Sequence, residues 1–276
     1  MRNSKETVLQ AAQHLALRLK QDVTGNRVPD VALVLGTGWG EALRLEHEHH
    51  ARLDHFSAFN GLAALEGHRR IVACGDVGSK RVIVLRGRVH LNEHPADPDL
   101  AMLVRLQVQM MLELGVRRFI LTNAAGALRD DVRVGDIVIA DGFVTLWAPV
   151  MPLYGGEFCS PEDALPGASA RGDARHLCPS ALTARLGGYA MVRGPFFEGR
   201  RYDKTLLKAT GAACVGMSTV PEACVISLYR GAKALCLSFI TNDDKEEHSH
   251  ETNVSRAAEK SAYLGEYLER LIAALP

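Results

Sequence analysis

Three segments of the chain end an apolar run in small residues, and each of them can bind an anion. The sequence reads Gly-Thr-Gly-Trp-Gly at residues 36–40, Thr-Asn-Ala-Ala-Gly at residues 122–126 and Gly-Met-Ser-Thr-Val-Pro at residues 216–221. Small side chains leave backbone N–H groups accessible, and clusters of such groups bind phosphate. One segment alone fits an ordinary turn equally well. Three of them indicate one oxyanion site assembled from strand ends.

Charged and polar side chains follow other apolar runs. Arg88 and His90 are two positions apart, which places them on one side of an extended chain, and an arginine fork grips two phosphate oxygens. Glu198 follows two phenylalanines, where a desolvated carboxylate needs a hydrogen-bond donor. Asn242 ends an apolar run and offers a donor and an acceptor to a heteroaromatic base. Taken singly, these residues also fit a solvated loop, a helix N-terminus and a turn.

Histidines raise a second kind of chemistry. Histidine side chains are common metal ligands. A metal-dependent hydrolase that uses His90, His94, His248 and His250 is therefore an alternative. The spacing does not match the His-Glu-x-x-His zinc motif, because Glu93 directly precedes His94. We expect no metal in the site.

Apolar spacing predicts the elements that position these residues. We expect helices over residues 6–20, 100–114, 220–229 and 255–275, and strands over residues 31–35, 70–74, 80–85, 118–122, 136–140, 142–146 and 234–240. Alternation of strand and helix predicts one α/β domain over residues 1–276, with a mainly parallel mixed central β-sheet flanked by helices. Ligands of such sheets bind at the carboxyl ends of strands. The apolar residues in 149–180 follow neither helical nor strand spacing, and we interpret this segment as a long functional loop.

Composition narrows the function classes. The 276 residues are 47% hydrophobic and 23% charged, and the formal net charge is zero, which gives no general attraction to nucleic acid or to an anionic membrane. Six cysteines without a C-x-x-C pair indicate reduced thiols. There is no signal-peptide core and no apolar run long enough for a membrane span. We expect a cytoplasmic protein.

The small-residue segments and the charged and polar residues described above, taken in their order along the chain, closely resemble the trimeric purine nucleoside phosphorylase family. This family includes methylthioadenosine phosphorylases. The resemblance runs from about Val31 to Val254, and the motifs Thr-Asn-Ala-Ala-Gly and Gly-Met-Ser-Thr-Val-Pro-Glu are its most specific parts. It implies that a purine nucleoside and inorganic phosphate, a co-substrate, give the free base and ribose 1-phosphate. It implies no further cofactor.

The resemblance also assigns site residues. The implied phosphate ligands are Thr37, His68, Arg88, His90, the backbone of Ala124, and Ser218. The implied base and ribose contacts are Asn92, Phe197, Glu198, Met217, Asn242 and His250. Among these, the catalytic roles fall to Asn242 and Glu198 at the base edge, His90 at the phosphate and His250 near the ribose 5′ hydroxyl. Phe197 would pack on the base, and Met217 would line the ribose.

The chain departs from the family pattern in three places. Asn92 stands where the family commonly has an aromatic residue that touches the ribose. Asp243 and Asp244 follow Asn242, and residues 149–180 diverge. In the family an aromatic from this last region reaches into a neighbour's site, and Phe158 is the candidate here. A homotrimer is therefore implied.

Glu198 bears on the choice of base. A 6-oxopurine carries an N1–H donor that satisfies a carboxylate, whereas adenine presents an acceptor there. We therefore expect inosine, guanosine and their deoxy forms as substrates, with xanthosine a further candidate. One alternative is a methylthio-nucleoside phosphorylase, which His250 disfavours. Another is a nucleoside-binding homologue that has lost turnover, which the presence of Asn92 allows.

Overall fold

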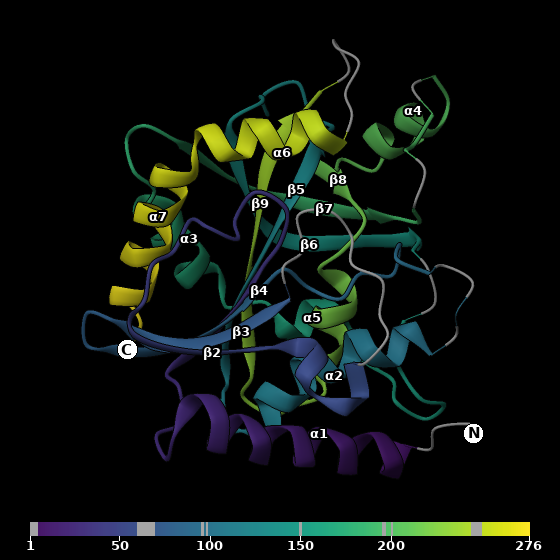
Figure 1. Ribbon diagram of the computed structural model, residues 1–276. Coiled ribbons are helices and arrows are strands. Elements are labelled where there is room, and N and C mark those ends of the chain that lie inside the picture. The colour runs from purple at the N-terminus through teal and green to yellow at the C-terminus, as the bar shows by residue number, and fades with distance from the viewer. Residues whose placement is uncertain are drawn as a thin grey trace.

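A nine-stranded sheet runs through the described part of the chain, with helices packed around it (Figure 1). The computed structural model describes residues 5–59, 70–94, 97, 99–148, 151–194, 197–199, 201–243 and 250–276, without the side chains of residues 250–254. The strands are β1 Val31–Leu35, β2 Glu46–Arg52, β3 Ile71–Val77, β4 Lys80–Arg86, β5 Arg118–Ala127, β6 Asp136–Trp147, β7 Thr183–Val192, β8 Cys214–Gly216 and β9 Lys233–Asn242. The helices are α1 Lys5–Leu19, α2 Leu100–Glu113, α3 Ala168–His176, α4 Asp203–Ala209, α5 Val220–Ser227, α6 His250–Glu259 and α7 Ser261–Ala273.

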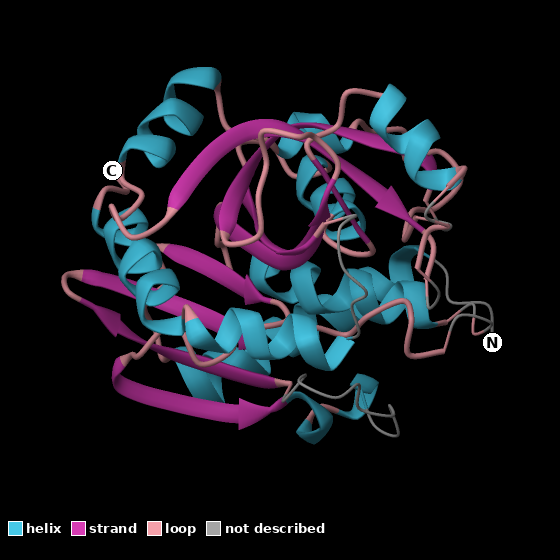
Figure 2. Cartoon of the chain, turned by 90° about the horizontal axis from the view of Figure 1, so that it is seen from above, coloured by secondary structure: helices cyan, strands magenta, loops and turns pink. Residues whose placement is uncertain are grey.

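The strand order is β2-β3-β4-β1-β5-β8-β7-β6-β9, and β9 pairs again with β5. The strands β5, β8, β7, β6 and β9 therefore close on themselves, and their curvature is visible from above (Figure 2). Strand β1 is parallel to β4 and β5, and β5 is parallel to β9, whereas β2–β3–β4 is an antiparallel meander. The predicted fold class, a mixed sheet flanked by helices, is confirmed.

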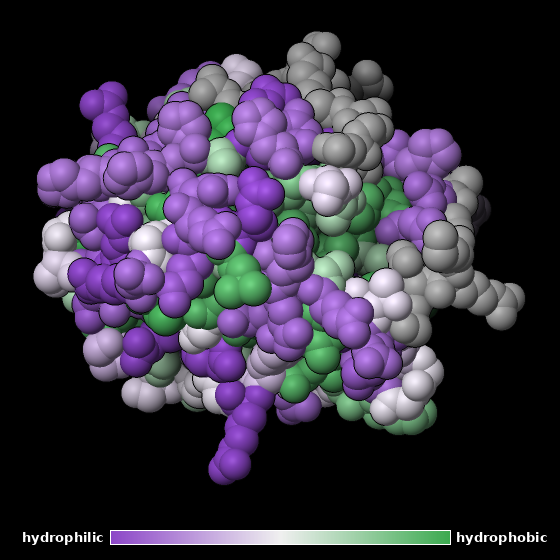
Figure 3. All heavy atoms as spheres, turned by 60° about the horizontal axis from the view of Figure 1, so that its bottom comes forward, coloured by the Kyte–Doolittle hydropathy of each residue, from purple (hydrophilic) through white to green (hydrophobic). Residues whose placement is uncertain are grey.

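Burial explains why the central elements form. All five residues of β1 are buried, as expected for a strand covered on both faces. Helix α1 buries Val8, Ala12, Leu15 and Leu19, which lie on one face at helical spacing. Its other face is polar, and the side of the molecule where α1 lies is mostly hydrophilic (Figure 3). Within the described residues, no helix combines the length and apolar character needed to cross a bilayer.

Several predicted elements need correction. Residues 136–140 and 142–146 form one strand, β6, because its pairing with β7 continues past a register shift between Ala140 and Phe143. The predicted terminal helix divides into α6 and α7 at Lys260. The loop predicted over residues 149–180 contains, within its described part, a 3-10 turn at Pro161–Ala164 and helix α3. Ala164 and Leu165 are buried in the core and anchor this segment.

Candidate active site

Arg88 is the central cation of the site and lies two residues beyond the end of β4. Its side chain is buried, and Nη1 donates to Oε1 of Glu222 at 2.6 Å. Nη2 donates to the carbonyl of Thr122 on β5 and, at 3.5 Å, to that of Val34 on β1. One guanidinium thus joins β1, β5 and the first turn of α5. The guanidinium therefore lies at the carboxyl end of β1 and beside the middle of β5.

Hydrogen bonds connect the three small-residue segments to one another. The amide of Gly36 donates to Oγ1 of Thr122 at 3.1 Å, and Nε1 of Trp39 donates to the carbonyl of Asn123 at 3.0 Å. Asn123 in turn donates from Nδ2 to Oγ1 of Thr219 at 2.7 Å. All five residues are buried. The predicted convergence of these segments is therefore present in the fold.

The three hydroxyl and backbone groups expected to bind phosphate adjoin this network. Thr37 follows Gly36, Ala124 follows Asn123, and Ser218 precedes Thr219; Thr37, Ala124 and Ser218 are each half-buried. The network thus brings their segments together at one edge of the sheet, with the buried partners below.

The backbone at Thr219 is strained. Its φ of 74° lies in the left-handed region, which a β-branched residue rarely adopts. The hydrogen bond from Asn123 helps to hold this conformation, and the amide of Ser218 donates to the hydroxyl of Tyr189 at 3.2 Å. Strain that the surroundings impose is common at ligand-binding sites. The loop before α5 is therefore held in one conformation from two sides.

The segment after β4 is fixed through its backbone. The buried side-chain amide of Gln107, on α2, accepts from the amide of Val89 at 2.7 Å and donates to the carbonyl of Val89 at 3.1 Å. The backbone amide of His90 donates to Oε1 of Glu93 at 2.9 Å. The same carboxylate pairs with Arg70, and burial raises the pKa of Glu93.

The imidazole of His90 has a defined orientation. Its Nδ1 accepts a hydrogen bond from the amide of Asn92 at 3.0 Å. In the neutral ring, Nε2 then carries the hydrogen and acts as a donor. His90 is half-buried, so this donor suits an anion at the surface of the site.

Asn242 ends β9 and is 5% exposed. Its Oδ1 accepts from Oγ1 of Thr241 at 3.2 Å, and Arg256 of α6 donates to the carbonyl of Thr241 at 2.7 Å. On β5, Gly126 lies opposite, and a Cβ there would be 2.7 Å from Nδ2 of Asn242. The bond from Thr241 directs Nδ2 as the donor of this amide.

Glu198 occupies a different environment. Its side chain is 7% exposed, and Oε1 lies 3.6 Å from Nζ of Lys204. A small cavity of about 180 Å³ adjoins it, lined by Trp147, Val192, Arg193, Glu198, Asp203, Leu206 and Leu207. Neither Asn242 nor Met217 lines this cavity. The structure therefore places the two residues expected at the base edge in separate surroundings.

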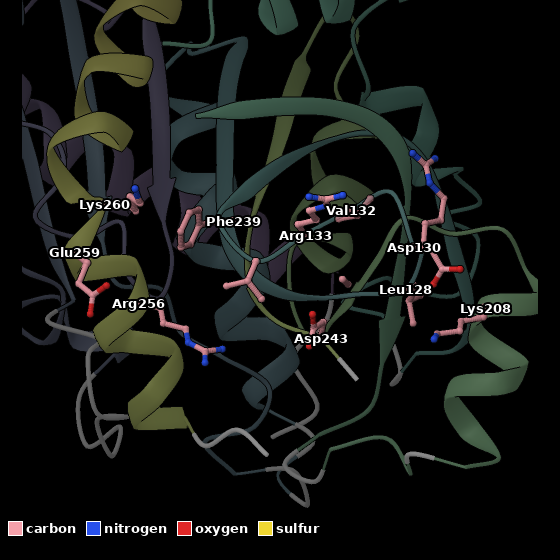
Figure 4. Close-up of a pocket in the computed structure, with 14 residues that line it drawn as sticks. Leu128, Asp130, Val132, Arg133, Lys208, Phe239, Asp243, Arg256, Glu259 and Lys260 are labelled. Carbon is pink, nitrogen blue, oxygen red and sulfur yellow. The ribbon is translucent and has the colours of Figure 1, made fainter. Parts of the chain in front are cut away.

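A cavity of about 990 Å³ is lined by residues around the end of β9, among them Phe239 and Asp243 (Figure 4). Arg256, Glu259 and Lys260 lie on one side of it and Lys208 on the other, with Asp243 between them. Of the described residues expected to bind phosphate or nucleoside, none lines it. The convergence of strand ends, and not this cavity, therefore defines the candidate site.

The remaining residues expected in the site differ in how exposed they are, and two of them are described only in part or not at all. Phe197 is 48% exposed and Met217 is half-buried. Phe158 is 94% exposed, next to a Glu157 that is anchored by Arg105. His68 lies outside the described residues, and His250 begins α6 but its side chain is not described. Among the described residues, no three His, Cys, Asp or Glu side chains gather in a group that could hold a metal ion.

Sequence reasoning missed three residues that position the site. Glu222 was part of the Gly-Met-Ser-Thr-Val-Pro-Glu motif but received no role, although it pairs with Arg88 and fixes its position. Gln107 holds Val89, and Tyr189 holds Ser218. A glutamine among the apolar residues of a predicted helix was the available signal for Gln107. Nothing in the sequence around Tyr189 indicates its partner.

Comparisons with known proteins show which proteins this chain is similar to. The sequence profile described as "Phosphorylase superfamily" matches residues 30–273. The chain is 34% identical to purine nucleoside phosphorylase of Mycobacterium tuberculosis over 97% of this chain and 96% of that protein. It is 28% identical to purine nucleoside phosphorylase of Mus musculus over 90% of this chain and 88% of the mouse protein.

Solved structures share the fold. The crystal structure of isoform 2 of purine nucleoside phosphorylase from Schistosoma mansoni, in complex with cytosine and ribose-1-phosphate, superposes with a TM-score of 0.80 at 24% identity, covering 97% of both chains. Purine nucleoside phosphorylase of the same organism in complex with inosine superposes with a TM-score of 0.79 at 22% identity and the same coverage.

Proposed function

The chain belongs to the phosphorylase superfamily, among its purine nucleoside phosphorylases, which are pentosyltransferases, and we propose that it catalyses the phosphorolysis of 6-oxopurine ribonucleosides and deoxyribonucleosides. Inosine and guanosine are the proposed substrates, with xanthosine a further candidate. The products are the free base and the pentose 1-phosphate. We place this reaction in the cytoplasm.

The observation that carries the proposal is the convergence of the three small-residue segments above one buried arginine. Phosphate is held by the hydroxyls of Thr37 and Ser218, by the backbone at Ala124 and by Nε2–H of His90. The guanidinium of Arg88 supplies positive charge from below, and Glu222 fixes its position. Oriented donors that need no rearrangement stabilise an anion better than water does.

The bound phosphate then attacks the anomeric carbon. As the bond to the purine breaks, positive charge develops on the sugar and negative charge on the leaving base, as in glycoside hydrolysis. The phosphate dianion stabilises the first charge. The Nδ2 donor of Asn242, directed at N7 of the base, stabilises the second. Holding the two substrates in contact supplies much of the remaining rate enhancement.

Glu198 sets the preference for 6-oxopurines. Its carboxylate accepts from the N1–H of hypoxanthine or guanine and faces an unfavourable acceptor in adenine. In the described structure Glu198 pairs with Lys204. To accept a hydrogen bond from the base, Glu198 must therefore turn from Lys204 toward the substrate. Phe197, half of whose surface is exposed, packs on the base when it binds.

The proposed assembly is a homotrimer. Phe158 is almost fully exposed, while the neighbouring Glu157 is held by Arg105 and Lys5. A large apolar side chain presented from an anchored segment suits insertion into a neighbouring subunit. Sedimentation of wild type and Phe158→Ser tests this: we expect a trimer that the variant weakens.

Release of free base from a nucleoside panel tests the function. Inosine, guanosine, xanthosine, adenosine and methylthioadenosine are each incubated with and without phosphate. We expect release from the 6-oxopurine nucleosides only when phosphate is present. Release from methylthioadenosine alone would instead support the methylthio-nucleoside alternative, and nucleoside binding without release would support a non-catalytic homologue.

Variants separate the roles of the base-edge residues. Asn242→Ala should lower kcat at least about a hundredfold because it removes the donor to the leaving base, whereas the matched change Asn26→Ala at the exposed surface should not. Glu198→Gln, which can donate as well as accept, should raise the adenosine-to-inosine ratio of kcat/KM. A Glu198→Gln enzyme with an unchanged ratio would contradict the role of Glu198.

A further inference from the structure

Arg70 is a buried cation next to the segment that follows β4. It directly precedes β3, whose first residue, Ile71, pairs with Arg86, the last residue of β4. The Arg70 side chain is 9% exposed. Its φ of 52° lies in the left-handed region, which residues other than glycine rarely adopt. Such a conformation persists only where the surroundings impose it, and it is common at ligand-binding sites.

A buried carboxylate links Arg70 to His90. Nη2 of Arg70 donates to Oε2 of Glu93, whose side chain is 2% exposed. The second oxygen, Oε1, accepts from the backbone amide of His90 at 2.9 Å. The amide of Glu93 donates in return to the carbonyl of His90 at 3.0 Å. Glu93 therefore closes the turn over residues 90–93, and Arg70 holds Glu93 from the start of β3.

The charge of Glu93 depends on Arg70. Burial raises the pKa of Glu93, whereas the backbone amide of His90 and the charge and hydrogen bond of Arg70 oppose that rise. Among the described residues, these are the groups that act on the Glu93 carboxyl, and the next titratable side chain along the turn, His94, is exposed. Without Arg70 the pKa of Glu93 should rise further. Protonation would then weaken the bond from His90, because an ionised acceptor makes the stronger hydrogen bond.

Under the proposed function, on which this inference rests, Arg88 and His90 bind phosphate from this same segment. We propose that Arg70 is a positioning residue for the phosphate co-substrate, which holds the Glu93 carboxylate, and through it the backbone of His90, in the geometry that binds the anion. Arg70 also balances a carboxylate that would otherwise repel phosphate. The effect should fall on phosphate and not on the nucleoside, because these contacts lead from Arg70 to His90.

Two variants separate this role from a purely structural one. Arg70→Met removes the charge and keeps the strained backbone, whereas Arg70→Gly removes the charge and relieves the strain. Urea denaturation should therefore show Arg70→Gly to be the more stable of the two. We nevertheless expect KM for phosphate to rise about tenfold in both, with little change in KM for inosine. A rise in Arg70→Met that is absent in Arg70→Gly overturns the proposal.

Two further variants serve as rescue and control. Arg70→Lys keeps the charge and should recover most of the phosphate affinity. Arg81→Met is the matched control, because Arg81 pairs with Asp76 at 3.2 Å on the same β3–β4 hairpin. It should leave KM for phosphate unchanged. An equal rise in Arg81→Met and Arg70→Met would mean that any loss of charge from the hairpin weakens the site, and it overturns the proposal.

A pH series gives a readout that a structural role would not change. The ionisation of free phosphate is common to all variants and cancels in the ratio of KM values, variant to wild type. In Arg70→Met the raised pKa of Glu93 means that its carboxylate is lost as the pH falls, so the ratio should grow from about pH 8 to about pH 6. Glu93→Gln, which has no proton to gain, should raise KM without this dependence. A flat ratio in Arg70→Met overturns the proposal.

Binding of inorganic phosphate separates this inference from the proposed function. Calorimetric titration with phosphate requires no turnover. If no nucleoside releases its base but Arg70→Met still binds phosphate more weakly than wild type and Arg81→Met, the inference holds and the phosphorylase assignment fails. If base is released and Arg70→Met binds phosphate as wild type does, the inference alone is overturned. A wild-type protein that binds no phosphate overturns both.

Discussion

Nη1 of Arg88 and Oε1 of Glu222 lie 2.6 Å apart, although 134 positions separate the two residues in the sequence. Their side chains are 2% and 1% exposed. A buried charge is tolerated when it is paired and hydrogen-bonded, and here the pair joins the end of β4 to the first turn of α5. Glu222 thereby fixes Arg88 relative to the loop that contains Ser218.

Glu222→Gln should destabilise the fold strongly. Removing one partner of a buried ion pair leaves the other charge uncompensated, and we expect the free energy of unfolding to fall by about 3 kcal/mol. Urea denaturation measures this. Glu266→Gln is the matched control, because Glu266 pairs with Arg270 at the same 2.6 Å but with both side chains nearly half exposed. There the change should stay below about 1 kcal/mol. Equal losses in the two variants would contradict the role of burial.

Tyr189→Phe should weaken the binding of phosphate. The hydroxyl of Tyr189 accepts from the amide of Ser218, and without it the loop before α5 loses one of its two supports. We expect KM for phosphate to rise about three- to tenfold, with a smaller effect on KM for the nucleoside. Burial raises the pKa of Tyr189, so the effect should not vary across the neutral and mildly alkaline range.

Initial rates at varied phosphate measure this effect. Tyr263→Phe, an exposed tyrosine of α7 that contacts Lys260 through its ring, is the control and should leave KM unchanged. A Tyr189→Phe enzyme that loses nucleoside affinity but keeps its phosphate affinity would show that the loop serves the base and not the anion.

Glu157 should make the fold sensitive to acid. Burial alone would raise the pKa of Glu157, but hydrogen bonds from Arg105, the Tyr154 amide and Lys5 together outweigh it and lower the pKa to about 2. This lies below the ordinary value of 4.5. The stabilisation from the carboxylate is therefore complete above about pH 4.5 and is lost as the pH falls toward 2.

We expect Glu157→Gln to be less stable than wild type at pH 7 by about 3 kcal/mol, because the buried Arg105 loses its partner. The difference should shrink as the pH falls below about 4.5. Urea unfolding at a series of pH values measures both. The exposed Glu6→Gln should follow the wild-type curve, and a constant gap between Glu157→Gln and wild type at every pH would show that another group is responsible.

How much the sequence predicts depends on whether the signal is local. Strand β1 and helix α2 were predicted because their apolar residues are contiguous or at helical spacing. Strand β2 was missed because its residues, at an edge of the sheet, are almost all exposed and polar. Its place is set by pairing with β3, which no local pattern records.

In the site, too, residues with a local sequence signal were predicted and their distant partners were not. The small-residue segments and Arg88 carry a local signal, since each follows an apolar run. The partner of Arg88 lies 134 positions away, and the hydroxyl that accepts from the Ser218 amide belongs to Tyr189, a tyrosine within β7 that resembles any other core aromatic. The pairing of Glu198 with Lys204 could not be predicted either, because it depends on how α4 packs. Sequence therefore indicates which residues gather, whereas tertiary packing determines how each is held.

Gly126→Ala should lower activity through Asn242 alone. Gly126 has no positive φ, so alanine brings no backbone strain, but its Cβ would lie 2.7 Å from Nδ2 of Asn242. The amide must turn away from the base it serves. We expect kcat to fall about ten- to a hundredfold, while KM for phosphate changes little. Gly155→Ala, which meets no atom within 4 Å, is the control.

A double-mutant cycle distinguishes this route from a general loss of structure. If Gly126→Ala acts only by displacing the amide, it should have little further effect on kcat in an Asn242→Ala background, because the group it displaces is already absent. Additive losses would instead mean that the Cβ disturbs β5 and the phosphate segment that follows from it. The cycle therefore measures whether the close approach of these two strands at Gly126 exists to orient the donor of Asn242.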